Sequence, residues 1–206
     1  MQRITEDQMA PVARLLAECF IDEPVTAYQI NGISNGQDFL VNLFNMQLEI
    51  YSATKDVFVL DKRNSGVIIG SEKKNSKRFK QIVTSIRASS KLRRMSGKAD
   101  YKTYTRNLTT VLKEVDLNWQ KKYVDSNYYH LSIMAVASEH RGKGYASKLI
   151  APIIALSKDK QIPLTLETAN TDQIGLYEHW GFELVKTITG DKTGIHQYCF
   201  IRQTED

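Results

Sequence analysis

The sequence contains little cysteine and no long apolar run, and both absences exclude whole classes of protein. Of its 206 residues only Cys19 and Cys199 are cysteines. Two thiols so far apart form neither a disulfide framework nor a metal-ligand pair, so we expect both to be reduced core residues and expect no metal site. No apolar run approaches the roughly 20 residues of a membrane span. The first ten residues lack the apolar stretch of a secretory signal, so we expect a cytoplasmic protein without a membrane partner.

The composition that is present indicates one domain. The chain is 42% hydrophobic and 25% charged, which is ordinary for a globular protein with a sizeable core. It contains no internal repeat, low-complexity tract or linker, so residues 1–206 are predicted to form a single domain. Neither the composition nor the pattern of residues fixes an oligomeric state, and we expect a monomer or a homodimer.

The net charge of +5 is concentrated in one segment. Between Lys73 and Lys102 lie eleven lysines and arginines and a single acid, Asp100. Such a segment either faces nucleic acid or another anion, or forms a solvated helix face. No nucleic-acid motif accompanies these charges, so we expect no nucleic-acid partner and predict a basic helical segment over about 73–123.

The spacing of apolar residues predicts helices and strands in a definite order. A helix should begin at the capping box of Thr5 and Gln8 and end before Pro24, and another should run from about Asp38 to Ser52. Residues 25–37 between them are predicted to be an irregular loop that could border a pocket. In the basic segment, apolar residues at helical spacing are Phe79, Ile82, Val83 and Ile86, and a further helix is expected from Tyr101 to Tyr123. Strands are predicted at Asp56–Asp61, Gly66–Gly70, His130–Val136, Pro163–Thr168, Phe182–Thr187 and Ile195–Ile201.

This order of elements predicts an α/β fold of the mixed α+β kind. Helices come early, a hairpin follows, and strands then alternate with helices before a final strand pair. We therefore expect a mixed sheet with helices on both faces. Pro152 conflicts locally with this prediction, because it falls inside the helix expected from Tyr145 to Leu156 and should cost a backbone hydrogen bond.

A glycine-containing loop joins the strand at His130–Val136 to that helix. The first N–H groups of a helix have no partner within the helix, and the macrodipole is positive there. Glycine allows a bulky anion to approach the backbone, so the loop from Arg141 to Ala146 could bind a phosphate group. A tight turn without a ligand would have the same sequence, and the loop alone does not distinguish the two.

Two motifs in order resemble those of the GCN5-related N-acetyltransferases, the GNAT family. Residues 141–146 (RGKGYA) fit the family's Arg/Gln-x-x-Gly-x-Gly/Ala loop, which directly follows a strand. Asn170 is followed seven residues later by Tyr177 within LYEHWGF, which is similar to the family's Asn…Leu-Tyr-Glu-x-x-Gly-Phe segment. This resemblance covers about residues 128–182 and implies a mostly antiparallel central sheet. The segments HLSIMAV, LETAN and HQYC look most like the puromycin-acetyltransferase-like branch.

The resemblance implies acetyl-CoA as co-substrate and assigns residues to it. The pyrophosphate would lie on the loop amides, and the pantetheine arm would pair with the preceding strand end. Asn170 would hydrogen-bond the cofactor or fix the end of its strand, although the same residue could be a plain helix cap. The implied cofactor-binding residues are Met134, Ala135, Val136, Arg141, Gly142, Lys143, Gly144, Tyr145, Ala146, Asn170 and Tyr177.

Acetyl transfer to an amine requires two proton movements. The amine must lose a proton and the departing thiolate must gain one. Tyr177 occupies the family position of the acid, and a phenol is protonated at neutral pH. His130 is a candidate base because imidazole titrates near neutrality, and Glu167 could be the base or an anchor for the substrate ammonium. Each also has a structural reading: Tyr177 as a packing residue, His130 bonded to a backbone carbonyl, and Glu167 as a surface carboxylate.

The predicted function is N-acetyl transfer from acetyl-CoA to a primary amine of a small molecule. No cysteine occupies a motif position, which favours direct attack in a ternary complex over an acetyl-enzyme. The alternatives are a peptide or protein N-acetyltransferase and a non-catalytic module that binds CoA or nucleic acid. A closed pocket under the early segments would favour a small molecule, whereas an open acidic groove would favour a protein.

Overall fold

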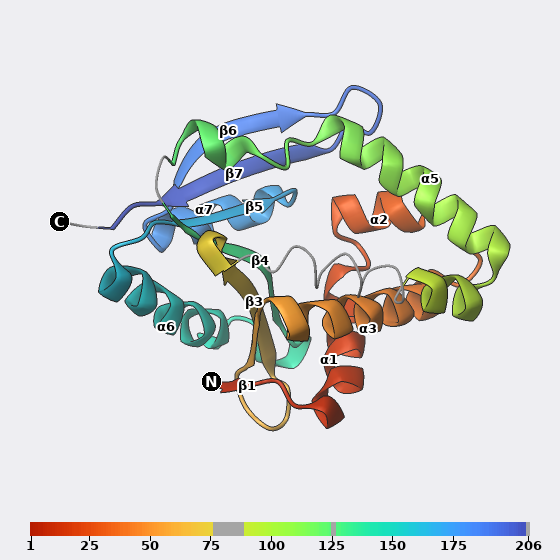
Figure 1. Cartoon of the computed structure of the whole chain (residues 1–206), viewed down its shortest axis with the longest axis horizontal. Coiled ribbons are helices and arrows are strands. Elements are labelled where there is room, and N and C mark those ends of the chain that lie inside the picture. The colour runs from red at the N-terminus through yellow and green to blue at the C-terminus, as the bar shows by residue number, and fades with distance from the viewer. Residues whose placement is uncertain (76–88, 125–126, 205–206) are drawn as a thin grey trace.

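A seven-stranded mixed sheet with helices on both faces forms the core of the molecule (Figure 1). The computed structural model describes residues 1–75, 89–124 and 127–204. The predicted contacts of Phe79, Ile82, Val83 and Ile86 lie outside these residues. The helices are α1 (Glu6–Phe20), α2 (Pro24–Ile30), α3 (Gly36–Thr54), α5 (Lys98–Glu114), α6 (Tyr145–Lys160) and α7 (Ile174–His179), and residues 89–96 are also helical. The strands are β1 (Gln2–Arg3), β2 (Asp56–Val59), β3 (Gly66–Glu72), β4 (Tyr129–Val136), β5 (Leu164–Thr168), β6 (Glu183–Thr189) and β7 (His196–Arg202).

The strands follow the order β1-β2-β3-β4-β5-β7-β6. Every neighbouring pair is antiparallel except β4 and β5, which are parallel. The parallel pair is possible because α6 carries the chain back between the two strands. The predicted fold class, a mixed and mostly antiparallel sheet between helices, is confirmed.

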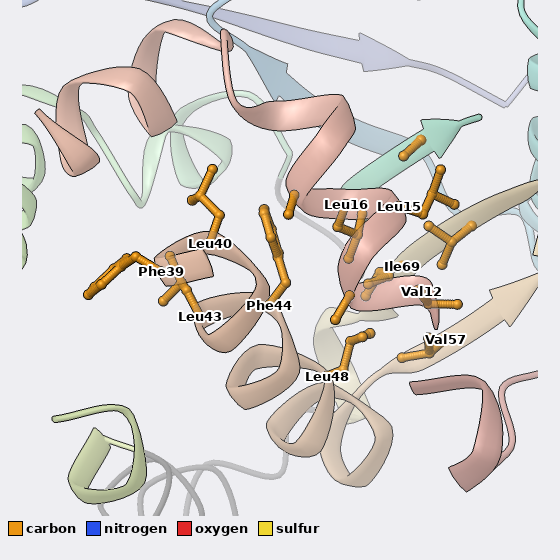
Figure 2. Close-up of a cluster of buried hydrophobic side chains, with 14 of the residues drawn as sticks. Val12, Leu15, Leu16, Phe39, Leu40, Leu43, Phe44, Leu48, Val57 and Ile69 are labelled. Atoms are coloured by element: carbon orange, nitrogen blue, oxygen red, sulfur yellow. The ribbon is translucent and has the colours of Figure 1, made fainter. Parts of the chain in front are cut away.

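Each face of the sheet carries its own apolar cluster. Helices α1 and α3 pack on one face, where Leu16, Leu40 and Leu48 meet Val57 and Ile69 of the hairpin (Figure 2). Helices α6 and α7 pack on the opposite face, with side chains that alternate with the first set along the strands. We call these the α3 face and the α6 face.

A bulge at Ser132 divides β4 into two halves. The pairing of β3 with β4 runs Ile69 to Ile133 and then Gly70 to Leu131, so Ser132 has no opposite residue. An extra residue reverses which side chains point to which face. His130 consequently lies on the α3 face before the bulge, and Ile133 lies on the same face after it.

Beyond the bulge, β4 and β5 separate. Their parallel pairing covers only Tyr129–Leu131 with Leu164–Leu166, although β4 continues to Val136 and β5 to Thr168. The edge of β4 that faces β5 is therefore left without a strand partner along its last residues. This separation is the feature that creates the site.

Two local predictions were wrong, and a third concerns Pro152. The segment 25–37 is not a loop throughout, because Pro24 stands in the first turn of α2 and the Glu23 carboxylate accepts the amide of Thr26 at 2.9 Å. Helix α5 ends at Glu114 and a separate 3₁₀ turn follows at Trp119–Lys122, instead of one helix to Tyr123. Pro152 lies inside α6, as predicted, and the helix continues beyond it to Lys160.

Candidate active site

A cavity of about 320 Å³ lies where β4 and β5 separate. Side chains from α1, α2, α3 and α5 line it on the α3 face, and Tyr177 of α7 lines it from the α6 face. The ends of β4, β5 and β7 supply the rest of its wall. The cavity therefore lies in the gap between the two strands and is lined from both faces of the sheet.

The loop predicted to bind phosphate leaves two glycines in left-handed conformations at the start of α6. Gly142 has φ 71° and Gly144 has φ 75°, and nothing lies within 4 Å of the position where either Cβ would be. Gly144 is the N-cap of α6, so the free amides of the first helical turn follow it. The loop thus has the backbone shape and the open space that an anion requires.

Two basic side chains of this loop are bonded to the backbone that precedes it. Lys143 Nζ donates to the carbonyl of Glu139 at 2.8 Å, and Arg141 Nε donates to the carbonyl of Val136 at 3.3 Å. The Arg141 guanidinium also lies 3.5 Å from the Sγ of Cys19, which is half-buried, whereas Cys199 is buried. Both cysteines are free, as predicted, but only Cys199 is a fully buried core residue.

Tyr177 lines the cavity from the α6 face. Its ring is 8% exposed and packs against Phe182 and Phe200, and its hydroxyl donates to Gln173 Oε1 at 3.2 Å. Burial raises the pKa of Tyr177 to about 12. The phenol therefore keeps its proton at any physiological pH, as a proton donor must.

Asn170 has a capping role in the structure. Its side-chain oxygen accepts the amide of Asp172 at 2.9 Å, and its own amide donates to Thr168 Oγ1 at 3.1 Å. These bonds fix the turn between β5 and α7 and hence the position of Tyr177. The alternative of a helix cap is thus realised, while contact with a cofactor stays a prediction.

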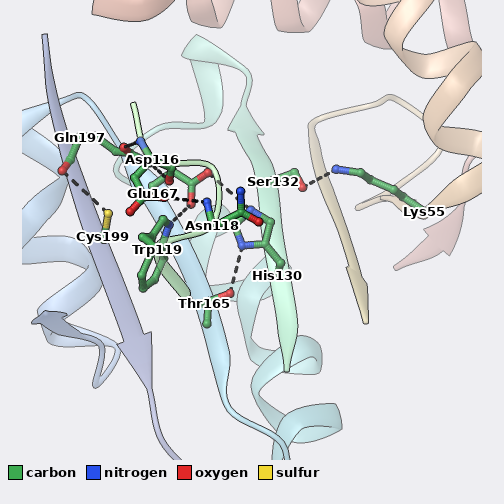
Figure 3. A network of polar contacts seen from close by, with 10 residues as sticks. All are labelled: Lys55, Asp116, Asn118, Trp119, His130, Ser132, Thr165, Glu167, Gln197 and Cys199. Carbon is green, nitrogen blue, oxygen red and sulfur yellow. Dashed lines mark hydrogen bonds and ion pairs between the residues drawn. The ribbon is translucent and has the colours of Figure 1, made fainter. Parts of the chain in front are cut away.

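Glu167 lines the cavity on the α3 face and lies close to His130 and Trp119 (Figure 3). Its Oε1 lies 3.7 Å from His130 Nε2, and its Oε2 accepts the indole N–H of Trp119 at 3.0 Å. The carboxylate side chain is 31% exposed, whereas Trp119 is fully buried. Glu167 is therefore fixed from behind by the Trp119 indole, with His130 beside it, and reaches the cavity at its front.

His130 does not line the cavity but lies one layer behind Glu167. Its Nδ1 is 3.0 Å from Thr165 Oγ1, so each ring nitrogen has a polar neighbour. Burial lowers the pKa of His130, the nearby carboxylate of Glu167 opposes that shift, and the Lys55 ammonium adds to it. The imidazole is consequently neutral at neutral pH and can accept a proton.

Trp119 and Lys55 belong to this network but carry no signal in the sequence. Trp119 is placed by the preceding turn, where Asp116 bonds to the side chain of Gln197 on β7. Lys55, at the end of α3, donates to the bulged Ser132 at 2.7 Å, and burial lowers the pKa of Lys55. These contacts join residues far apart in the chain, so no local motif could have indicated them.

The two candidate proton-transfer groups flank the opening from opposite faces. Tyr177 belongs to the cluster on the α6 face, and Glu167 shares the α3 face with His130 and Trp119. A thioester in the gap would have a proton donor on one side and a carboxylate on the other. This arrangement suits the direct transfer of an acyl group between two bound molecules.

Residues 112–184 match the family model described as acetyltransferase (GNAT) domain. This part of the chain is therefore similar to a GNAT acetyltransferase domain, and the predicted resemblance is confirmed. A Schizosaccharomyces pombe protein described as an uncharacterised N-acetyltransferase is 32% identical over 83 residues, which are 39% of this chain. The chain spans about a third of that relative's length, since the match covers 34% of it.

Solved acetyltransferases have the same fold along the whole chain. A Corynebacterium glutamicum structure titled histone acetyltransferase HPA2 and related acetyltransferase superposes with a TM-score of 0.69 at 18% identity, covering 100% of this chain and 96% of that one. Arylalkylamine N-acetyltransferase 2 of Aedes aegypti gives 0.60 at 16% identity, covering 99% and 98%. The NatC complex bound to Gag peptide and CoA gives 0.53 at 16%, covering 99% and 97%. These likenesses establish the fold and leave the acceptor open.

Proposed function

We propose that this protein is an N-acetyltransferase that transfers acetyl from acetyl-CoA to a primary amine of a small molecule, by direct attack in a ternary complex. The observation that carries the proposal is the opening between β4 and β5, with Tyr177 on one face and Glu167 on the other. The loop at residues 141–146 lies at the end of the same β4 strand, where the pyrophosphate of the co-substrate would bind.

The residues present fit acetyl-CoA in two further respects. The open space over Gly142 and Gly144 leaves the loop amides accessible to a bulky anion, with two basic side chains beside them. The edge of β4 over Met134 to Val136 has no strand partner, although the Val136 carbonyl accepts from Arg141. This edge can accept an extended chain by β-type hydrogen bonds, as the pantetheine arm would provide. An amide of that edge could also stabilise the oxyanion of the reaction.

The geometry supports a balanced set of proton movements. The acceptor ammonium loses one proton to Glu167, with neutral His130 behind the carboxylate as the next acceptor. The neutral amine then attacks the thioester carbon, and the amide C–N bond forms as the C–S bond breaks. Tyr177 donates its proton to the departing sulfur, and its phenolate recovers a proton from the second N–H that the nitrogen gives up as it becomes an amide. A pKa of about 12 makes this phenol a weak acid, so we expect its proton transfer to accompany C–S cleavage.

Direct transfer is favoured because no cysteine lines the cavity among the residues that the structure describes. Cys19 faces Arg141, and Cys199 is buried behind Glu167 on β7. Neither thiol is placed to attack a thioester in the opening.

A small-molecule acceptor is favoured over a peptide by what covers the cavity. The segment at residues 25–37, predicted to border a pocket, contains α2, and α2 lines the cavity. Together with α3 and the end of α5, it covers the cavity on the α3 face. Such a cover leaves a bounded cavity, whereas a protein substrate would need an open groove.

No helix long and apolar enough to cross a membrane occurs in the described part of the chain.

A turnover screen tests the proposal. The purified protein is incubated with acetyl-CoA and a panel of alkylamines, aromatic amines, aminonucleosides, polyamines and peptides with free N-termini. Thiol release and the mass of the acetylated product are measured together. Acetylation of a small amine supports the proposal, acetylation of peptides alone transfers the function to the peptide alternative, and thiol release with no acceptor overturns direct transfer to an amine.

A further inference from the structure

The cavity is acidic within a basic protein. The chain carries 28 lysines and arginines against 23 acids, yet no lysine or arginine lines this cavity among the described residues. The charged residues in its wall are Glu23 and Glu167, and most of the remaining wall is apolar. Carboxylates in an apolar cavity disfavour an anionic acceptor and favour a cationic one with an apolar body.

Only one of the two carboxylates can serve the reacting nitrogen. That nitrogen must be a neutral amine when it attacks, so it cannot remain an ammonium bound to Glu167. A lasting contact between cation and carboxylate requires a second basic group on the acceptor. Glu23 is the remaining carboxylate and takes no part in the proposed proton transfers.

Glu23 has a free oxygen for such a contact. Its Oε2 accepts both the amide of Thr26 at 2.9 Å and the hydroxyl of the same residue at 3.0 Å. Oε1 has no hydrogen-bond or ion-pair partner within the part of the chain that the structure describes. The helix cap thus fixes the carboxylate in place and leaves one oxygen available to a ligand.

Glu23 and Glu167 come from different elements of the cavity wall. Glu167 is on β5 at the opening of the sheet, and Glu23 is the N-cap of α2, next to Pro24. Pro24 lines a second hollow of about 510 Å³ between α2 and the β6–β7 turn, which shares Ala169, Ile195 and His196 with the first cavity. Glu23 is therefore adjacent in the chain to a residue of this second hollow.

We propose that the acceptor is a diamine-type molecule, with an apolar spacer between the amine that reacts near Glu167 and a second cationic group bound by Glu23. This inference rests on the proposed function and adds the substrate class. The spacer would contact the apolar wall formed by α1, α3 and α5. Glu23 acts here as a specificity residue and not as a proton-transfer group.

The test compares acceptors that differ only at the distal end. A series of α,ω-diamines is assayed beside amino alcohols and n-alkylamines of equal length, in wild type and in Glu23→Gln. Glutamine keeps an oxygen for the Thr26 amide, so the α2 cap is retained. Asp22→Asn is the matched control, because it removes one charge at the neighbouring position and does not line the cavity.

A charge-assisted contact predicts roughly a 10- to 100-fold higher kcat/KM for the diamine than for the amino alcohol in wild type. In Glu23→Gln the ratio of kcat/KM for diamine over amino alcohol should fall to near unity, because the KM of the diamine rises while the kinetics of the amino alcohol are unchanged. In Asp22→Asn the ratio should stay at its wild-type value. A preference that survives Glu23→Gln, or a wild type that acetylates alkylamines equally well, overturns the inference and leaves the acetyltransferase function intact. A protein that acetylates no amine overturns both.

Discussion

Replacing Tyr177 by phenylalanine separates catalysis from folding, because the hydroxyl and the ring have different contacts. The ring packs against Trp180, Phe182 and Phe200, and a phenylalanine ring preserves all of that packing. The hydroxyl makes one hydrogen bond, to Gln173 Oε1, which also accepts from Thr168 at 3.0 Å. The acceptor therefore keeps a donor in the variant.

The expected loss of stability is small. A neutral hydrogen bond contributes about 1 kcal/mol, so Tm should fall by roughly 2–4 °C. The expected loss of activity is much larger, since a general acid contributes roughly 100- to 10,000-fold in rate. We expect kcat to fall by that factor while the Kd of CoA stays within about threefold of wild type, because the phosphate loop is untouched.

The assay is thiol release at saturating acetyl-CoA and amine, with CoA binding measured by calorimetry. Tyr198→Phe is the matched control, because Tyr198 also packs in the α6-face cluster but does not line the cavity. A pKa of about 12 further predicts that wild-type kcat shows no decline from loss of this proton below roughly pH 10. A Tyr177→Phe kcat within threefold of wild type would refute the assignment of Tyr177 as the acid.

Three further predictions concern the loop and the carboxylate. Gly144→Glu should abolish the increase in Tm that CoA causes in a thermal shift assay. Gly144→Ala places a side chain at the same φ of 75° but adds no charge, so it should reduce that increase far less. If both variants reduce the increase equally, backbone strain explains the loss and the anion-binding role of the loop is contradicted. His130→Ala should lose roughly 10- to 100-fold in kcat/KM at neutral pH and less at high pH, where the amine deprotonates unaided, and a loss constant with pH would contradict its role as base. Trp119→Phe removes the indole N–H that donates to Glu167 at 3.0 Å, and it should lower kcat about tenfold while the affinity for CoA is unchanged. An unchanged kcat would exclude a role for Trp119 in positioning Glu167.

The sequence predicted the parts of the site that are local in the chain. The loop at 141–146, the cap at Asn170 and the placement of Tyr177 depend on residues within one turn or motif, and the structure has each of these elements where the motif indicated. The strands are found close to their predicted bounds because their apolar residues are consecutive or alternate. Helix α2 was missed because its seven residues show little periodicity, and its start at Glu23 and Pro24 was not recognised as a cap.

The acceptor side could not be predicted in the same way. Trp119 is 48 residues from Glu167, and Lys55 is 77 residues from Ser132, so their contacts depend on how the sheet is assembled. The bulge at Ser132 decides which face His130 occupies, and nothing in the apolar pattern of β4 indicates a one-residue shift. The acidic lining of the cavity emerges only when α1, α2 and β5 are brought together.

The separation of β4 and β5 also affects the order in which ligands bind and leave. The cavity receives residues from both faces of the sheet, so a co-substrate on the α6 face and an acceptor on the α3 face would not share an entrance. If the proposed function is correct, neither product has to wait for the other to dissociate. Steady-state kinetics should then show intersecting lines and a random sequence, with CoA competing against acetyl-CoA and not against the amine.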